Sequence, residues 1–385
     1  MKFYRIDELP PYVFATVDAL KRELRRDGRD VIDLGFGNPD IPSPETAVEK
    51  LREAALNSRN HRYSASRGIE QLRNAVAERY ASVFGVALDP TTQIVSTIGA
   101  KEGLAHLMWV LVDRGDTVVV PSPAYPIHTV APRLAGATVV SPPAAGGIDA
   151  IEEAVRRDRP KAVIASFPHN PTTAVATAED MQRLVDLARE HEFLLVHDFA
   201  YADVAFDGHR PPSVLAADGA HDCAVELYSL TKSFSMAGWR VGFLLGNAEV
   251  VAALAKLKSY LDYGTFQPIQ IAATVTLREA TDYPAEVCAV YEHRRDVLIE
   301  GLDRAGWHVE PPRGTMFVWA PIPEPYRDQG SLDLALRLAR DAGVAVSPGI
   351  GFGEGGDGHV RFALVENEQR IRQATRAIKK LLAEH

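Results

Sequence analysis

The sequence predicts an α/β fold with a mostly parallel sheet, helices on both of its faces, and a smaller α+β domain. Between about residues 90 and 246, short apolar runs alternate with amphipathic helical windows. After Gly246 the pattern changes to successive helices followed by a few short strands. The length of 385 residues is enough for two domains, or for one large domain with a substantial core.

The apolar runs of the first region mostly contain consecutive apolar residues, which is typical of strands that are covered on both faces. The expected strands are Ile94–Ile98, Thr117–Val120, Ala137–Ser141, Ala162–Ser166, Phe193–His197 and Ala224–Tyr228. Ala178–Glu190 represents the helices between them, because Met181 and Leu184 fall on one face. Thr177 and Asp180 resemble a capping box at its start.

The second region predicts a smaller α+β domain. Its expected helices are Ala248–Asp262, Gln267–Glu279, Pro284–Ala305, Ser331–Ala342 and a closing helix that Asn367 caps. Its expected strands are His308–Glu310, Thr315–Ala320 and His359–Ala363. We expect three parts: an N-terminal arm that joins the small domain (1–40), a large domain (41–280) and a small C-terminal domain (281–385). The Pro-rich segment from Pro39 to Pro44 is the candidate first boundary.

Composition excludes several classes of protein. The chain is 46% hydrophobic and 24% charged, as ordinary globular proteins are. Its net charge of −9 argues against a nucleic-acid-binding protein, which needs a basic face. The two cysteines, Cys223 and Cys288, are far apart, which excludes a Cys-based zinc site and a disulfide framework and fits the cytoplasm. We also expect no signal peptide and no membrane span.

The segment from Ser229 to Arg240 carries the most specific chemistry. A hydroxyl and a guanidinium, at Ser229 and Arg240, can bind a phosphate. Lys232 between them is placed to form a Schiff base with an aldehyde on the same phosphorylated molecule. Pyridoxal 5'-phosphate (PLP) fits that description. The alternative, a surface loop with two unrelated cations, is weakened by the apolar run before the segment and by its aromatic residues.

Further candidates follow the expected strands, where open α/β sheets bind ligands. Gly99 and Lys101 lie in a turn that opens a helix and could offer N–H groups to a phosphate, although such glycines are often only steric. Asp198 could pair with a pyridinium nitrogen, or could cap a helix. Tyr201 could hydrogen-bond the ring's phenolic oxygen, or could be packing.

Three other candidates have an ordinary interpretation as well as a functional one. Asn170 is either a turn residue or a ligand-facing amide. Tyr125 either packs in a turn or stacks on an aromatic ring. Arg361, flanked by apolar residues, is either clamped on a substrate carboxylate or, the favoured reading, in an internal salt bridge. His128 and His169 have no metal-ligand spacing and are interpreted as structural, so no metal site is expected.

Taken together, these motifs resemble the class I/II, fold-type-I PLP-dependent aminotransferases over essentially the whole chain. The motifs are Gly37-Asn-Pro-Asp40, Tyr63 in Tyr-Ser-Ala-Ser-Arg-Gly68, Gly99-Ala-Lys101, Tyr125, Asn170-Pro-Thr172, Asp198-x-Ala-Tyr201, Ser229-x-x-Lys232 with Arg240, and Arg361. The nearer resemblance is to the bacterial glutamate–pyruvate (alanine) aminotransferases. It rests on the segments Val196–Asp203, Lys258–Phe266 and Val346–Gly353. The resemblance implies a mostly parallel seven-stranded sheet.

The resemblance also implies roles around the PLP ring. Lys232 would carry PLP as a Schiff base, and would then move the proton between the substrate Cα and the cofactor's aldehyde carbon. Asp198 would hold the ring nitrogen. Tyr201 and Asn170 would contact the phenolic oxygen, and Tyr125 would stack on the ring.

For the phosphate, the resemblance implies backbone groups of Ala100 and Lys101 together with Ser229 and Arg240. Tyr63 would reach the phosphate of the neighbouring subunit, so the active form would be a homodimer with shared active sites.

For the substrate, the resemblance implies that Arg361 clamps the α-carboxylate, helped by Asn170 and the backbone of Gly37. Two departures from the family pattern are visible, since Thr231 replaces a common serine and His169 replaces a small polar residue. Neither change removes a catalytic function.

The expected activity is amino transfer between L-alanine and 2-oxoglutarate. The same machinery with LL-diaminopimelate, aspartate or methionine is the alternative, followed by a PLP-dependent carbon–sulfur lyase. The sensor part of a PLP-binding transcription regulator is a fourth reading, disfavoured because such regulators have a basic DNA-binding domain before the PLP fold. Arg67 and Lys101 are possible partners for a distal carboxylate, but their spacing does not decide the substrate.

Overall fold

A computed structural model describes residues 1–7, 9 and 12–384 of the chain. Its largest sheet has seven strands in the order β2-β8-β7-β6-β5-β3-β4. The strands are β2 (Ile94–Thr97), β3 (Thr117–Val119), β4 (Thr138–Val140), β5 (Ala162–Ser166), β6 (Leu194–Asp198), β7 (Ala224–Ser229) and β8 (Gly242–Gly246). All neighbours pair in parallel except β8, which is antiparallel to both β2 and β7. The six expected strands are confirmed, and β8 is an addition to them.

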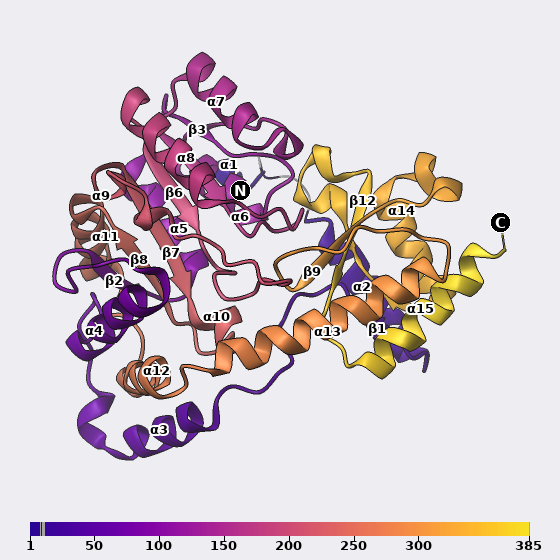
Figure 1. The fold of residues 1–385 in the computed structure, drawn as a ribbon, viewed down its shortest axis with the longest axis horizontal. Helices are drawn as coiled ribbons and strands as arrows, with labels where there is room; N and C mark the ends of the chain where they lie inside the picture. The colour runs from indigo at the N-terminus through magenta and orange to yellow at the C-terminus, as the bar shows by residue number, and fades with distance from the viewer. Residues whose placement is uncertain (8, 10–11, 385) are drawn as a thin grey trace.

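Helices cover both faces of this sheet (Figure 1). One face packs on α5 (Ala100–Leu111), α6 (Pro126–Ala135) and α11 (Ala248–Leu261). The other packs on α4 (Glu70–Arg79), α7 (Gly147–Asp158), α8 (Ala178–His191), α9 (Ala220–Cys223) and α12 (Gln267–Glu279). The expected capping box at the start of α8 is present, with Thr177 and Asp180 each accepting the other's backbone N–H. The predicted α/β fold is therefore confirmed.

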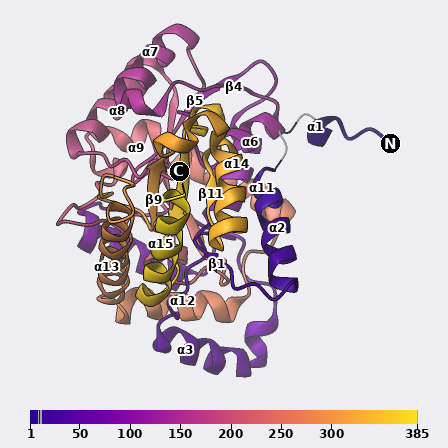
Figure 2. The same cartoon turned by 90° about the vertical axis from the view of Figure 1, so that its right-hand side faces the viewer.

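A second core lies beside the large sheet and joins residues from both ends of the chain. Its strands are β1 (Ile32–Asp33), β9 (Phe317–Pro321), β10 (Val344–Ala345), β11 (Ser347–Pro348) and β12 (His359–Ala363). β1 pairs in parallel with β10, whereas β11, β12 and β9 form an antiparallel sheet. Its helices are α2 (Phe14–Arg26), α14 (Gly330–Arg337) and α15 (Glu368–Leu382). Figure 2 shows α2 beside α14, which it contacts.

The remaining helices are α1 (Tyr4–Asp7), α3 (Glu45–Leu56), which packs on α12, α10 (Leu230–Ser233) and α13 (Tyr283–Asp303). In Figure 1, α13 runs from the region of α10 and α12 to the smaller core. The pairing of β1 with β10 agrees with an N-terminal arm that joins the small domain, while the boundaries at residues 40 and 280 stay a proposal. No helix within the described residues combines the length and the apolar character of a membrane span.

One expected strand is wrong. Residues 308–310 form no strand, because no neighbouring segment pairs with them. His308 is exposed there and pairs with Asp303 at the end of α13. The apolar residue that suggested a strand, Val309, is half-buried against the smaller core.

Candidate active site

A cavity of about 480 Å³ lies where the carboxyl ends of β5, β6 and β7 face the smaller core. Such strand ends are the usual ligand site of open α/β sheets. Eleven of the twelve sequence-predicted site residues line it: Gly37, Ala100, Lys101, Tyr125, Asn170, Asp198, Tyr201, Ser229, Lys232, Arg240 and Arg361. Tyr63 does not. It is 85% exposed, and its ring lies 4.6 Å from that of Tyr263.

Lys232 lies in α10, directly after β7, and this position at the strand end places it in the cavity lining. Its Nζ donates a hydrogen bond to the backbone oxygen of Gly37 at 2.7 Å. Burial lowers the pKa of this amine to about 7, and the positive charges of Arg361 and Arg240 add to the effect. The neutral amine, which is the form that attacks a carbonyl or accepts a proton, is therefore populated near pH 7.

The turn from Ile98 to Lys101 and the residues Ser229 and Arg240 form one end of the cavity. Gly99 has φ 79° and precedes the first residue of α5, so a side chain there would be strained and would also collide with the Arg240 guanidinium. Arg240 donates to the backbone oxygen of Ala237 at 2.9 Å. No carboxylate of the described residues pairs with it, so a helix N-terminus and an unneutralised guanidinium converge as a phosphate site requires.

Asp198 is the last residue of β6 and lines the cavity. One carboxylate oxygen lies 2.7 Å from Nε2 of His128, and the other accepts the backbone N–H of Ala200. Asp198 caps no helix, because a turn follows β6. His128, interpreted from the sequence as structural, lines the cavity and contacts this carboxylate, which is compatible with that interpretation and orients Asp198. Their separation of 70 residues hides this pair in the sequence.

Two tyrosines face the cavity as neutral phenols. Burial raises the pKa of Tyr201 and of Tyr125 above the ordinary value, so both keep their protons at neutral pH. Tyr125 directly precedes α6, and Lys101 Nζ lies 5.6 Å from its ring centre. Each phenol can therefore donate a hydrogen bond to an anionic oxygen, and the Tyr125 ring offers a flat face.

Arg361 extends from β12 into the cavity between two aromatic rings. Its guanidinium carbon lies 3.8 Å from the ring centre of Phe317 and 4.6 Å from that of Phe352. It donates to the amide oxygen of Asn170 at 2.7 Å, and its Nε has no partner. Burial lowers its pKa to about 10, so it stays charged at neutral pH.

The internal salt bridge favoured for Arg361 is wrong. Within residues 1–7, 9 and 12–384 its protein acceptors are neutral: the Asn170 amide, the backbone oxygen of Gly35 and the Ser347 hydroxyl. The reason is that β12 places it between aromatic side chains rather than beside a carboxylate. A buried guanidinium without a carboxylate is ready to bind one from a ligand.

Several aromatic residues line the cavity although the sequence did not predict them as site residues. Phe14 of α2 packs edge-on against Phe352 at 5.0 Å, which brings the N-terminal region to the cavity wall. Phe317 packs against Tyr201 at 5.8 Å. Each looks like a core residue in the sequence, and no local pattern distinguishes an aromatic residue that lines a cavity from one that fills a core.

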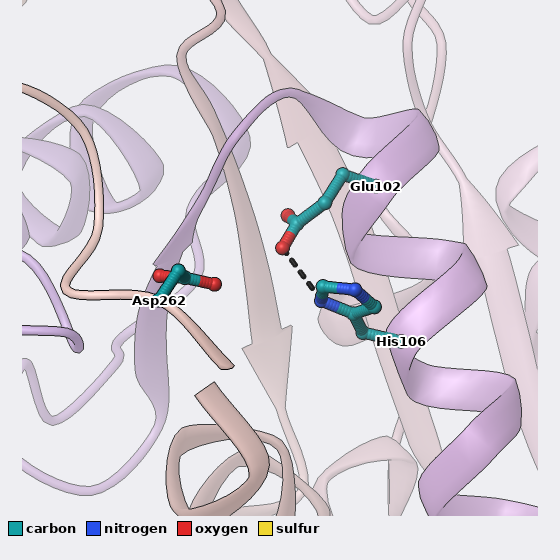
Figure 3. A group of neighbouring side chains, drawn as sticks. All are labelled: Glu102, His106 and Asp262. Atoms are coloured by element: carbon teal, nitrogen blue, oxygen red, sulfur yellow. Dashed lines mark ion pairs between the residues drawn. The ribbon is translucent and has the colours of Figure 1, made fainter. Parts of the chain in front are cut away.

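One group outside the cavity has the ligand types of a metal site: Glu102, His106 and Asp262 (Figure 3). However, Nζ of Lys258 lies 3.2 Å from Glu102 and 3.0 Å from Asp262. The lysine ammonium already supplies positive charge to both carboxylates and would repel a divalent cation. We propose no metal at this group.

The cavity residues fit PLP. An amine with a pKa near 7, a phosphate-binding end and a carboxylate surround one space. Gly37 strengthens the fit, because a Cβ there would lie 2.6 Å from the Phe317 ring and would fill the space next to Arg361.

Comparison with known proteins agrees with this geometry. The family model "Aminotransferase class I and II" matches residues 29–378. The chain is 50% identical to the glutamate-pyruvate aminotransferase AlaC of Escherichia coli, over 98% of this chain and 93% of that protein. It is 41% identical to the LL-diaminopimelate aminotransferase of Moorella thermoacetica, over 98% and 97%. The substrate-bound structure of BacF from Bacillus subtilis superposes with a TM-score of 0.93 at 34% identity, over 99% and 98%.

The chain therefore belongs to the class I and II aminotransferases and has the type I fold of PLP-dependent enzymes. It is an aminotransferase, and its cofactor is PLP.

Proposed function

We propose that this aminotransferase moves an amino group between L-alanine and 2-oxoglutarate, giving pyruvate and L-glutamate. The observation that carries this proposal is the carboxylate-free Arg361 between Phe317 and Phe352, in the same cavity as Lys232. A guanidinium without a protein carboxylate can bind the α-carboxylate that L-alanine and 2-oxoglutarate have in common. The 50% identity to a glutamate-pyruvate aminotransferase supports the same substrate pair.

Lys232 is the proposed proton carrier. When bound, PLP supplies an aldehyde that condenses with amines and a ring that accepts electrons from the substrate's α-carbon. The amine, displaced by the substrate, takes the α-proton and returns it at the cofactor's aldehyde carbon. Its pKa near 7 matches the working pH, and such acid–base help contributes about 10²–10⁴-fold.

The proposed contacts of the PLP ring are Asp198, Tyr201, Asn170 and Tyr125. The Asp198 carboxylate, held by His128, would pair with the ring nitrogen and keep it protonated. Tyr201 stays protonated and so would donate to the phenolic oxygen, to which the Asn170 amide would also donate. The Tyr125 ring would lie against the cofactor ring.

The phosphate is proposed to bind the backbone of Ala100 and Lys101, the Ser229 hydroxyl and the Arg240 guanidinium. Ser229 already donates to Thr231 at 2.9 Å, a contact that fixes the hydroxyl beside the start of α10. These groups and Arg361 line the same cavity, and the positive charges of both arginines act on the Lys232 amine.

The proposed substrate-binding groups are Arg361, Asn170 and the backbone of Gly37, which together form a clamp. The amide oxygen of Asn170 holds one terminal nitrogen of the guanidinium, and the Gly35 carbonyl and the Ser347 hydroxyl hold the other, which fixes the fork that would receive the α-carboxylate. Since the backbone oxygen of Gly37 accepts from Lys232, the clamp and the proton carrier are held together.

A homodimer with shared active sites is part of the proposal. Tyr63 is exposed and its ring packs against the exposed Tyr263, while Tyr260 and Phe266, close to Tyr263 in the sequence, are exposed as well. Such an aromatic surface is typical of a protein–protein interface. Tyr63 would reach the partner's phosphate site, and the cytoplasmic location also stays a proposal.

A panel of amino donors tests the substrate assignment. We expect transfer from L-alanine to 2-oxoglutarate to have the highest kcat/KM, ahead of LL-diaminopimelate, aspartate and methionine. The LL-diaminopimelate aminotransferase at 41% identity makes that donor the main competitor. A higher kcat/KM with LL-diaminopimelate would overturn the alanine assignment, release of pyruvate and ammonia from cystathionine would indicate a lyase, and full activity of Lys232→Ala would overturn the mechanism.

A further inference from the structure

Lys258 is a fully buried cation outside the cavity, in the last turn of α11. Its ammonium pairs with Glu102 of α5 and with Asp262, which follows α11. Figure 3 shows Glu102 and His106 on successive turns of α5, with Asp262 facing them from the other segment. A lysine with 0% exposure requires such pairing, and the proposed mechanism gives it no role.

Glu102 connects this cluster to the cavity. Its Oε2 accepts the backbone N–H of Ile98 at 2.8 Å, while Oε1 faces Lys258 and His106. The carbonyl of the same Ile98 accepts a longer hydrogen bond of 3.4 Å from Arg240. A continuous set of contacts therefore runs from α11 through Glu102 to the turn and the guanidinium at the proposed phosphate end.

Electrostatics gives the pairing a consequence for the phosphate. A carboxylate in the first turn of α5 is favoured by the helix dipole, but it repels a phosphate at the same N-terminus. The ammonium of Lys258 offsets the negative charge of Glu102 and of Asp262. It also holds Glu102 in the orientation that fixes the Ile98 N–H.

We propose that Lys258 is a positioning residue for the cofactor's phosphate, acting by neutralising Glu102 and by fixing the turn from Ile98 to Lys101. The inference rests on the proposed binding of the phosphate at that turn. It predicts a specific effect on phosphate recognition, with a smaller effect on recognition of the ring.

The test compares PLP with pyridoxal, which lacks the phosphate, in titrations of the cofactor-free full-length protein. We expect Lys258→Met to raise the Kd of PLP about tenfold, because the carboxylates near the phosphate lose their counter-charge. The Kd of pyridoxal should change less than about twofold. Equal weakening of both ligands, or no weakening, would overturn the inference.

A double variant separates charge from general damage. In Lys258→Met/Glu102→Gln the repelling carboxylate is gone, so we expect the preference for PLP over pyridoxal to recover most of its loss. A further loss would contradict the proposal. If Lys258→Met does not fold, Glu102→Gln alone serves, with an unchanged or increased PLP preference expected and a decreased one contradicting it.

Two controls complete the design. Arg295→Met removes another buried cation, paired with Asp207, and should lower stability without changing the PLP-to-pyridoxal ratio. Arg240→Lys should lower that ratio. An unchanged ratio in Arg240→Lys would contradict the placement of the phosphate, whereas a change there without one in Lys258→Met would overturn only the inference about Lys258.

Discussion

His197 and Asp198 are consecutive residues of β6, yet they belong to two buried polar clusters on opposite faces of the sheet. Strand neighbours alternate in direction: Leu195 packs with the core of α4, α7 and α8, and Val196 packs with that of α5, α6 and α11. On the His197 side lies the Glu226 cluster, formed by His197, Glu226, Tyr80 and Ser213. On the Asp198 side lies the Lys232 cluster, formed by Asp198, Lys232, Arg240 and Arg361.

The two clusters differ in how many of their polar groups have hydrogen-bond or ion-pair partners within the protein. Both Glu226 oxygens accept hydrogen bonds at 2.7–2.9 Å, from Tyr80, Ser213, the backbone of Val214 and His197. In the Lys232 cluster, Arg361 Nε has no partner, and neither Arg240 nor Arg361 pairs with a carboxylate of the described residues. The comparison indicates that the fully hydrogen-bonded Glu226 cluster contributes stability. The unpaired groups of the Lys232 cluster, which surround a cavity, are available to bind a ligand.

Lys232→Met should give the largest difference between the clusters. We expect kcat for transamination to fall by at least about 10³-fold, because the proton carrier is lost. The cofactor-free protein should be at least as stable as the wild type at pH 7, since burial of this amine lowers its pKa and so costs folding free energy. Steady-state kinetics and urea unfolding measure the two quantities, and a large loss of stability would contradict the comparison.

Asp198→Asn should reduce kcat by about 10²–10³-fold, because a neutral amide cannot keep the ring nitrogen protonated. The matched control is His197→Gln, one residue earlier on the same strand. That change should lower stability while leaving kcat within about threefold of the wild type. Comparable kcat losses in both variants would show that the two faces of β6 are not separate in function.

Glu226→Gln should act on stability alone. The amide retains one acceptor oxygen and places an NH₂ group among buried donors, so the free energy of unfolding should fall by about 3 kcal/mol. Urea denaturation gives that value, and a PLP titration serves as the control. A Kd for PLP raised more than a few fold in the folded variant would count against the assignment of this cluster to stability.

The pH dependence of PLP binding gives the smallest expected effect. Only the neutral amine of Lys232 attacks the aldehyde, and its pKa is about 7. The rate at which cofactor-free protein captures PLP should therefore rise with pH up to about 7 and level off above it. Stopped-flow absorbance measures the rate, and a rise that continues to pH 10 would indicate an amine with an ordinary pKa.

Much of the fold was predictable because buried parallel strands have a strong apolar signal. β8 was missed as a strand because Gly242–Gly246 has glycine, which disfavours strands, at both ends and only three larger apolar residues between them. His308–Glu310 was wrongly predicted as a strand, since a short mixed run cannot show whether a pairing partner exists. Pairing over long sequence distances, as between β1 and β10, is decided by the tertiary structure.

The candidate site was predictable where one residue type carries the chemistry, as for Lys232 and Arg240. The roles of His128 and Phe14 were not, because each depends on a contact between distant segments. For Arg361 the sequence favoured the wrong partner, since a cation in an apolar strand indicates burial but not what it faces. What these residues share is that they line one cavity, and no sequence motif reveals that.

The most direct test of the Lys232 assignment is borohydride reduction of the PLP-loaded protein, followed by peptide mapping by mass spectrometry. The account predicts that the reduced cofactor is attached to Lys232, and that prior addition of L-alanine prevents the attachment. Attachment to another lysine of the cavity, such as Lys101, would contradict it.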